Sequence, residues 1–215
     1  MAIYLDSAII AEAEAAQELG WVKGITTNPT LLAKSDLPPE STLKKLTQLT
    51  SGPVFYQLTS SEREDMLAEG RAAFKMIGQQ TVLKIPASLV GFQVVASLSS
   101  EIPCAVTAIY SPAQAVVARE AGAKYAIAYV NRATRLLGDG IALVREMANV
   151  LAGTTTEILA ASIKSPEEAV ASLQAGAHHL TLPLNMLQAM TTHNLSLQTI
   201  EEFNKNGCGI LQTVS

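Results

Sequence analysis

The stretch AVTAIYSPAQAVVAREAGAKYAIAYV, residues 105–130, contains one complete repeat of the pattern that decides the fold. Its apolar periodicity predicts a strand, an amphipathic helix and a second strand, over residues 105–109, 112–121 and 125–130. Ser111 and Pro112 are typical of a helix start, and Gly122 stands where the helix should end. Two strands joined by a helix indicate a parallel sheet with a helical crossover.

The same alternation of short apolar runs and longer amphipathic runs continues along the chain. Strands are predicted at residues 3–6, 22–26, 54–58, 81–85, 105–109, 125–130, 157–162 and 179–183. Helices are predicted at residues 8–19, 39–50, 62–77, 89–98, 112–121, 139–152, 166–175 and 184–191. Eight strand–helix units of about 27 residues match a closed α/β fold, the (β/α)8 TIM barrel, with residues 1–215 as a single domain. Residues 196–206 predict an additional C-terminal helix.

Residues at the predicted helix boundaries agree with this pattern. Ser60 and the pair Ser165-Pro166 offer further helix starts, and Gly176 stands where a helix should end. The alternative fold is an open doubly wound sheet, which needs a glycine-rich turn after an early strand. The segment LDSAIIAE, residues 5–12, contains no glycine, so the barrel is favoured.

The composition excludes several classes of protein. Apolar residues make up 48% of the chain and charged residues 16%, which excludes a disordered chain. Aromatic residues are only 5%, so we expect a core of Ala, Leu, Ile and Val. The net charge is −4, and binding to nucleic acid through phosphate contacts is not expected. The sequence has only two cysteines and no basic N-terminal leader, and no apolar run reaches about 18 residues. These features predict a cytoplasmic protein that does not span a membrane.

Polar residues gather at the predicted carboxyl ends of the strands, where a parallel barrel carries its chemistry. They are Asp6, Thr26, Thr27, Asn28, Gln57, Lys84, Thr107, Tyr129, Asn131, Arg132, Ser162, Lys164 and Thr181. Apolar neighbours place Lys84 and Asp6 within strands. Since an unpaired charge is costly to bury, we expect both side chains to face the barrel mouth or each other.

Lys84 lies in the strand segment VLKIP, residues 82–86. Strand alternation places Val82 and Lys84 on the same face. An amine in an apolar pocket has a lowered pKa and is partly neutral near pH 7, as attack on a carbonyl requires. Lys84 is therefore the predicted nucleophile, and a lysine that reaches solvent from a strand end is the alternative.

Metal chemistry has little support in the sequence. His178 and His179 are adjacent in an extended run and should point in opposite directions, so no metal is expected. No other cofactor is expected either, because a nucleophilic lysine attacks the carbonyl itself. Arg132, Ser162 and Lys164, which the pattern places on strands six and seven, suit a phosphate. Surface salt bridges are the alternative for these charges.

Four segments, in this order, resemble the transaldolase family. They are GITTNPT (24–30), LKIP (83–86), YVNR (129–132) and AASIK (160–164). The resemblance is closest to a small subgroup, the fructose 6-phosphate aldolases, and extends from Met1 to about Phe203. It implies a (β/α)8 barrel whose Schiff-base lysine lies on the fourth strand, the position of Lys84. The family usually has Thr at Ser88, and the tail after Phe203 does not match well.

The resemblance also implies roles for the strand-end residues. Lys84 matches the imine-forming lysine, and Asp6 matches the acid–base carboxylate. Thr26 and Asn28 match residues that contact the donor's hydroxyl groups. Gln57 and Thr107 match the pair that positions a catalytic water. The phosphate site is matched by Arg132, Ser162 and Lys164. Larger transaldolases usually have Glu at Gln57 and Phe at Tyr129, so this pair is the pattern of the aldolase subgroup.

The resemblance implies a class I aldolase that reversibly cleaves fructose 6-phosphate to dihydroxyacetone and glyceraldehyde 3-phosphate through an imine at Lys84. A transaldolase of the pentose phosphate pathway, which transfers a dihydroxyacetone unit between sugar phosphates, is the alternative. A catalytically idle barrel that binds sugar phosphates is a third hypothesis. The subgroup also implies a homo-oligomer, a pentamer or a decamer, that C-terminal helices help to hold together.

Overall fold

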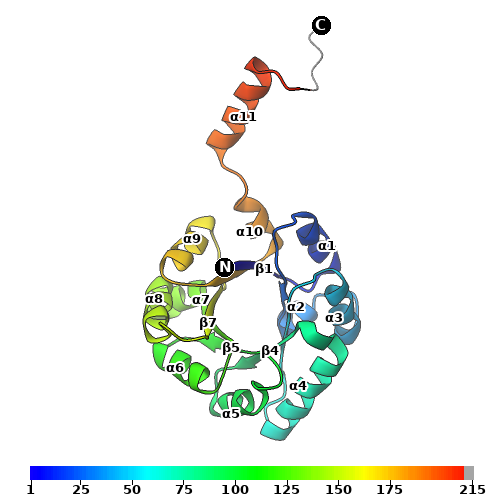
Figure 1. Cartoon of the computed structure of the whole chain (residues 1–215), viewed down its shortest axis with the longest axis vertical. Helices are drawn as coiled ribbons and strands as arrows, with labels where there is room; N and C mark the ends of the chain where they lie inside the picture. Colours follow the sequence, from blue (N-terminus) through cyan, green and yellow to red (C-terminus); the bar gives the residue numbers. More distant parts are fainter. Residues whose placement is uncertain (211–215) are drawn as a thin grey trace.

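A computed structural model describes residues 1–210 of the chain (Figure 1). These residues form eight strands: β1 (Ala2–Asp6), β2 (Ile25–Thr26), β3 (Val54–Gln57), β4 (Thr81–Pro86), β5 (Cys104–Ile109), β6 (Tyr125–Tyr129), β7 (Glu157–Ala161) and β8 (His179–Leu182). Each strand pairs in parallel with the next, and β8 pairs with β1 to close the barrel. The predicted (β/α)8 barrel is confirmed.

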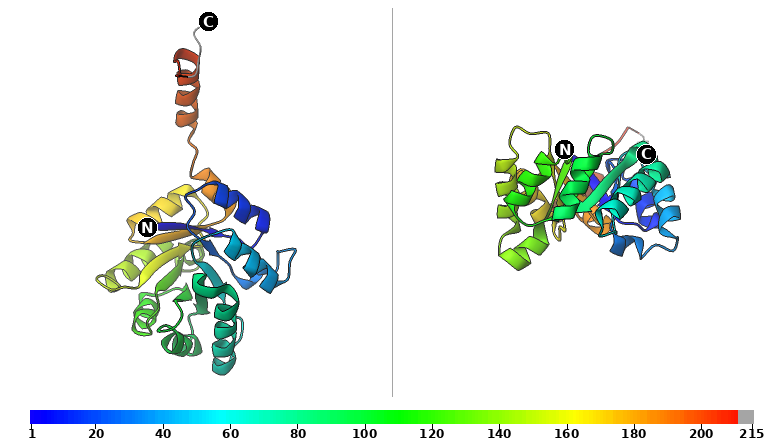
Figure 2. Two further views of the ribbon diagram at one scale, coloured as in Figure 1. Left: turned by 45° about the vertical axis from the view of Figure 1, so that its right-hand side comes forward. Right: turned by 90° about the horizontal axis from the view of Figure 1, so that it is seen from below.

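Helices surround the barrel on its outside (Figures 1 and 2). The surrounding helices are α1 (Ile10–Glu18), α2 (Pro29–Leu32), α3 (Pro39–Gln48), α4 (Arg63–Ile77), α5 (Leu89–Leu98), α6 (Pro112–Glu120), α7 (Val130–Leu137), α8 (Gly140–Val150), α9 (Pro166–Gln174) and α10 (Leu184–Ala189), with a 3-10 turn η1 (Gly78–Gln80). One further helix, α11 (Asn194–Asn206), follows them in the chain. Ser111 and Ser165 cap α6 and α9 as predicted, since each hydroxyl accepts a backbone N–H of the first turn. Gly176, at a φ of +108°, follows α9 in a conformation that favours glycine.

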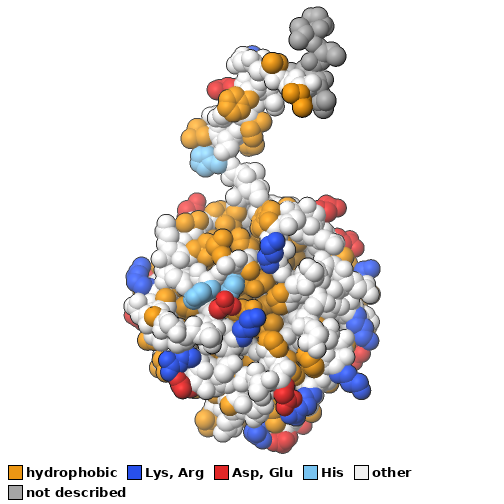
Figure 3. Space-filling model, viewed as in Figure 1, with side chains coloured by type: hydrophobic (Ala, Val, Ile, Leu, Met, Phe, Trp, Pro, Cys, Tyr) orange, Lys and Arg blue, Asp and Glu red, His pale blue; other side chains and the backbone are white. Residues whose placement is uncertain are grey.

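The C-terminal helix α11 stands apart from the barrel (Figures 1 and 2). The extra helix predicted at 196–206 is confirmed and begins two residues earlier. None of its residues is buried. Leu195, Leu197, Ile200 and Phe203 are between 53% and 68% exposed, and Figure 3 shows hydrophobic side chains along the protruding segment. Among the described residues, no helix combines the length and apolar character that crossing a bilayer requires.

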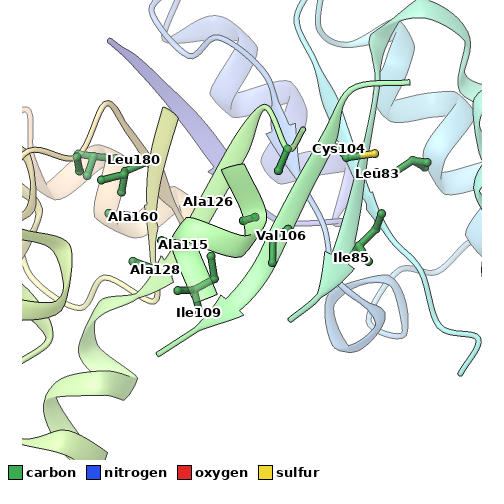
Figure 4. Packing of buried hydrophobic residues seen from close by; sticks show 14 of the residues in the cluster. Leu83, Ile85, Cys104, Val106, Ile109, Ala115, Ala126, Ala128, Ala160 and Leu180 are labelled. Atoms are coloured by element: carbon green, nitrogen blue, oxygen red, sulfur yellow. The ribbon is translucent and has the colours of Figure 1, made fainter. Parts of the chain in front are cut away.

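The buried side chains form an outer and an inner layer. The outer layer lies between strands and helices and includes Leu83, Ile85 and Val106 (Figure 4), in agreement with the expected aliphatic core. The inner layer fills the barrel and contains Phe55 between two tyrosines, Tyr4 and Tyr125, with ring centroids 5.4 and 5.3 Å away. The expectation of an aliphatic core holds only in part for this layer, because three of its eight buried residues, Tyr4, Phe55 and Tyr125, are aromatic. Large side chains are needed to fill the interior of the barrel.

Strand β2 is shorter than predicted, since it comprises two residues instead of 22–26. The backbone of Lys23 and Gly24 still bonds to β1, through Lys23 N to Ile3 O at 2.8 Å and Leu5 N to Gly24 O at 3.0 Å. On the other side the partner is Pro53, which has no N–H to donate. The ladder with β3 therefore begins only at Ile25, whose N–H donates to the Pro53 carbonyl at 2.9 Å.

Two short helices at the barrel mouth were not predicted. Helix α2 begins directly after Asn28, whose Oδ1 accepts the N–H of Leu31 at 2.9 Å, with Pro29 in the first turn. Helix α7 begins at the residue after β6, so no turn residues mark the change from strand to helix. The predicted cap Ser60 is wrong: α4 begins at Arg63, and the Ser60 N–H donates to Glu69 instead.

Candidate active site

A cavity of about 540 Å³ lies at the carboxyl ends of the barrel strands. Nine of the ten predicted site residues line it: Asp6, Thr26, Asn28, Gln57, Lys84, Tyr129, Arg132, Ser162 and Lys164. The tenth, Thr107, contacts the hydroxyl of Tyr129. The closed barrel therefore brings together residues spread over 158 positions of the sequence, from Asp6 to Lys164.

Lys84 lies on β4, in register with Gln57 on β3, and its side chain faces the inside of the barrel. Only 4% of the residue is exposed, and Nζ donates a hydrogen bond to the Thr27 carbonyl at 2.8 Å. Burial lowers the pKa of Lys84 to about 8, although the Asp6 carboxylate acts in the opposite direction. A lysine that reaches solvent is excluded, and at a pKa of about 8 roughly a tenth of the amine is neutral at pH 7.

Asp6 ends β1 and lies in register with Thr26 on β2. Thr26 Oγ1 donates to Asp6 Oδ1 at 2.9 Å and lies 2.5 Å from Thr181 Oγ1 on β8. Because the single hydroxyl proton of Thr26 is directed to the carboxylate, Thr181 donates to Thr26. Burial raises the pKa of Asp6, and Lys84 and the Thr26 hydrogen bond oppose the rise.

Tyr129 and Gln57 line the other polar side of the cavity, and Thr107 contacts Tyr129. Thr107 Oγ1 donates to the Tyr129 hydroxyl at 3.2 Å, and burial raises the pKa of Tyr129. A register shift between Val106 and Ile109, with Ala108 at a φ of +60°, interrupts the β5 ladder beside Thr107. Gln57 Oε1 is buried and has no hydrogen-bond partner among the described residues. A buried amide oxygen without a partner indicates a place for a bound donor such as water or substrate.

Arg132, Ser162 and Lys164 gather at the edge of the cavity. The prediction that they lie on strands six and seven is wrong in detail: Arg132 is in the first turn of α7, and Ser162 and Lys164 follow β7. The Arg132 guanidinium carbon lies 5.2 Å from the centroid of the Tyr129 ring. Ser162 has a φ of +60°, which is strained for a residue with a side chain.

Sequence reasoning missed part of the cavity wall. The α2 residues Pro29, Thr30 and Leu31 line it, because Asn28 is used as the cap of that helix. Ile127 also lines the cavity. Strand alternation could have identified Ile127, since it lies two residues before Tyr129 on the same strand face.

The histidines lie away from the cavity. His178 Nδ1 accepts the N–H of Ile158 at 3.0 Å, and His179 Nδ1 accepts the N–H of Ala2 at 3.0 Å, at the start of β1. Within residues 1–210, no three His, Cys, Asp or Glu side chains gather in a way that could hold a metal ion.

The fold and the cavity together define a (β/α)8-barrel protein with a buried lysine and a partly buried carboxylate at the carboxyl ends of its strands. A family profile described as "Transaldolase/Fructose-6-phosphate aldolase" matches residues 3–212. The chain belongs to this family of enzymes.

Two relatives illustrate the similarity. A probable transaldolase from Hydrogenobaculum sp. (strain Y04AAS1) is 37% identical over 209 residues, which cover 96% of each chain. A probable transaldolase from Aquifex aeolicus (strain VF5) is 35% identical over 209 residues, with the same coverage. Among solved structures, a mandelate oxidase variant matches with a TM-score of 0.63 at 18% identity, over 93% of this chain and 71% of that one. This last likeness shows the fold alone.

Proposed function

We propose that the protein is a class I aldolase that cleaves fructose 6-phosphate to dihydroxyacetone and glyceraldehyde 3-phosphate, and catalyses the reverse condensation. The observation that carries this proposal is Lys84, an amine 4% exposed, with a pKa of about 8, on the wall of a cavity shared with Asp6. These are the properties of a nucleophilic lysine.

The first steps form an imine at Lys84. The neutral amine adds to the C2 carbonyl of the ketose, and Asp6 relays protons so that the carbinolamine oxygen leaves as water. The resulting iminium nitrogen carries a positive charge close to the Asp6 carboxylate, which favours its formation. The Thr27 carbonyl, which accepts the hydrogen bond from the free amine, orients Nζ on the cavity wall.

The iminium then serves as the electron sink for cleavage of the C3–C4 bond. The C4 hydroxyl gives up its proton, the bond electrons form an enamine, and glyceraldehyde 3-phosphate leaves. Protonation of the enamine carbon and addition of water return Lys84 and release dihydroxyacetone. We assign this proton transfer to Tyr129 and to a water that Gln57 and Thr107 position, supported by the Thr107–Tyr129 hydrogen bond and the unpartnered Gln57 Oε1.

Gln57 and Tyr129 favour the aldolase over the transaldolase. An amide cannot titrate and can only orient a water, whereas a carboxylate at this position could transfer a proton itself. A phenol that protonates the enamine lets the three-carbon unit leave free. The transaldolase remains the second candidate, because the relatives described above carry that name.

The substrate's polar groups are assigned to the two sides of the cavity. Thr26 and Asn28 bind the hydroxyl groups of the donor, and Arg132, Ser162 and Lys164 bind the phosphate of the acceptor. We expect Arg132→Ala to raise KM for glyceraldehyde 3-phosphate about 10- to 150-fold, the equivalent of one charged hydrogen bond. KM for unphosphorylated glyceraldehyde should change little, and an equal rise for both aldehydes would show that Arg132 acts on the fold.

We also propose that the protein is a cytoplasmic homo-oligomer, a pentamer or a decamer. Leu197, Ile200 and Phe203 on α11 are exposed, and a helix without buried residues on its own chain gains stability by packing against a neighbouring copy. Deletion of residues 194–215 should lower the molecular mass in solution, as measured by light scattering, to that of smaller assemblies.

A product assay with fructose 6-phosphate as the only sugar tests the function. Free dihydroxyacetone formed without an acceptor supports the aldolase. Turnover only after addition of erythrose 4-phosphate supports the transaldolase. Borohydride trapping of a three-carbon unit on Lys84, without either activity, would leave the catalytically idle barrel as the interpretation.

A further inference from the structure

A carboxylate lies beside the cationic edge of the cavity and bridges two segments of the chain. Glu168, in the first turn of α9, accepts the backbone N–H of Lys164 through Oε2 at 2.7 Å. Its other oxygen, Oε1, accepts the side-chain N–H of Asn131 at 3.3 Å. The Glu168 N–H donates to Ser165 Oγ at 3.1 Å, and the position at the helix N-terminus favours the negative charge.

The two bridged segments carry the residues assigned to the phosphate. Asn131 precedes Arg132 at the start of α7, and Lys164 lies two residues after Ser162. A second link joins the same segments, since the Asn131 N–H donates to the Ser162 carbonyl at 3.1 Å. Asn131 therefore holds the turn after β7 with both its backbone and its side chain. The positive φ of Ser162 is maintained only when the surrounding contacts hold it.

A carboxylate near a phosphate site repels the ligand, so its presence there needs a structural reason. Glutamate provides two acceptor oxygens and glutamine only one. Two acceptors are needed here, because the Lys164 N–H and the Asn131 amide donate to separate oxygens of Glu168.

We propose that Glu168 and Asn131 are positioning residues that set the separation of Arg132 from Ser162 and Lys164, and so determine the preference for phosphorylated acceptors. This inference rests on the phosphate site of the proposed function. Groups that are already in place bind a ligand without an ordering cost, and loosening them weakens binding of the phosphate alone.

The test measures KM for glyceraldehyde 3-phosphate and for glyceraldehyde, with dihydroxyacetone as donor. Glu168→Ala should raise KM for the phosphorylated aldehyde about 2- to 10-fold, the range of one hydrogen bond, with KM for glyceraldehyde unchanged. Charge alone predicts a lower KM for the phosphorylated aldehyde in Glu168→Ala, because removing a carboxylate lowers the repulsion of the phosphate. Glu167→Ala is the matched control, because Glu167 is exposed, lies on the same turn and carries the same charge. In this variant KM for glyceraldehyde 3-phosphate should stay constant or fall.

Three further variants test the bridge itself. Asn131→Ala removes one of the two hydrogen bonds that Glu168 accepts, so KM for glyceraldehyde 3-phosphate should rise, but no more than in Glu168→Ala. The double variant should be no worse than Glu168→Ala, because the side-chain bond of Asn131 is already lost there. Glu168→Gln, which keeps one acceptor, should give a smaller rise and serves as the variant to measure if Glu168→Ala does not fold.

The outcomes separate this inference from the proposed function. An unchanged or lower KM for glyceraldehyde 3-phosphate in Glu168→Ala, or an equal rise for both aldehydes, overturns the positioning role while a selective effect of Arg132→Ala keeps the phosphate site. If Arg132→Ala affects both aldehydes alike, the phosphate site fails and the positioning role fails with it.

Discussion

Buried polar side chains lie at both ends of the barrel, but their surroundings differ. At the amino end, His179 Nδ1 accepts the Ala2 N–H at 3.0 Å, and the ring lies against Tyr4 and Tyr125. Its Nε2 lies 3.1 Å from Glu157 Oε2, which makes an ion pair when the ring is protonated. At the carboxyl end, Lys84 faces a cavity of about 540 Å³.

This difference shows which buried polar groups serve the fold and which are available to a ligand. A buried group that packs against its own neighbours stabilises one arrangement, whereas a buried group that faces a cavity keeps its reactivity for a bound molecule. Variants at the carboxyl end should therefore change activity with little effect on stability, and variants at the amino end should do the reverse.

The largest expected effect at the carboxyl end is that of Lys84→Arg. Activity should fall by at least about 10³-fold, because a guanidinium stays protonated and cannot add to a carbonyl. Borohydride with dihydroxyacetone should label Lys84 in the wild type, as read by peptide mass spectrometry. Labelling at another lysine would contradict the assignment, and circular dichroism serves as the control for folding.

The next effect concerns Tyr129. Tyr129→Phe should lower the cleavage of fructose 6-phosphate about 10²-fold or more, the scale of one acid–base group, because the enamine then lacks its proton donor. Adding Gln57→Glu should raise transfer to erythrose 4-phosphate. Cleavage at the wild-type rate in Tyr129→Phe would show that the ring only packs at the cavity wall and would favour the transaldolase.

The pKa of Lys84 predicts the pH dependence of imine formation. Only the neutral amine reacts, and its pKa is lowered to about 8, so the rate should fall about tenfold per pH unit below pH 8 and level off above it. Since the Asp6 carboxylate raises the pKa of Lys84, Asp6→Asn should move this limb to lower pH. Single-turnover borohydride trapping measures both profiles, and an unshifted limb would show that the two groups are not coupled.

The smallest effect is expected at the amino end. Burial lowers the pKa of His179, so the unfolded chain binds the proton more readily than the folded one. The free energy of unfolding should therefore fall as the pH drops below about 6.5, by at most about 1.4 kcal/mol per pH unit. In His179→Phe this part of the pH dependence should disappear in urea titrations, with kcat near pH 8 within about twofold. A large loss of kcat would contradict the view that the amino end serves stability and the carboxyl end serves activity.

Local pattern was sufficient to predict the fold and most of the candidate site. Strand and helix periods are properties of neighbouring residues, so the eight repeats, the caps Ser111 and Ser165 and the placement of Lys84 on a strand follow from the order of the amino acids alone. The unpredicted helix α7 follows its strand directly, and only two residues separate α2 from β2. A polar residue there is compatible with either a loop or a helix, and only the packed barrel mouth decides between them.

What only the tertiary structure decided is which distant residues meet. Closure of the barrel brings β8 beside β1, so that Thr181 reaches Thr26 across Asp6, a contact that the alternation within any one strand does not predict. In the same way Glu168 meets Asn131, 37 positions earlier. The sequence by itself determined the repeating unit and its reactive amine, because both depend on periodicity and chemical type. The partners that position these groups depend on the register and closure of the sheet, which arise only when all eight units pack together.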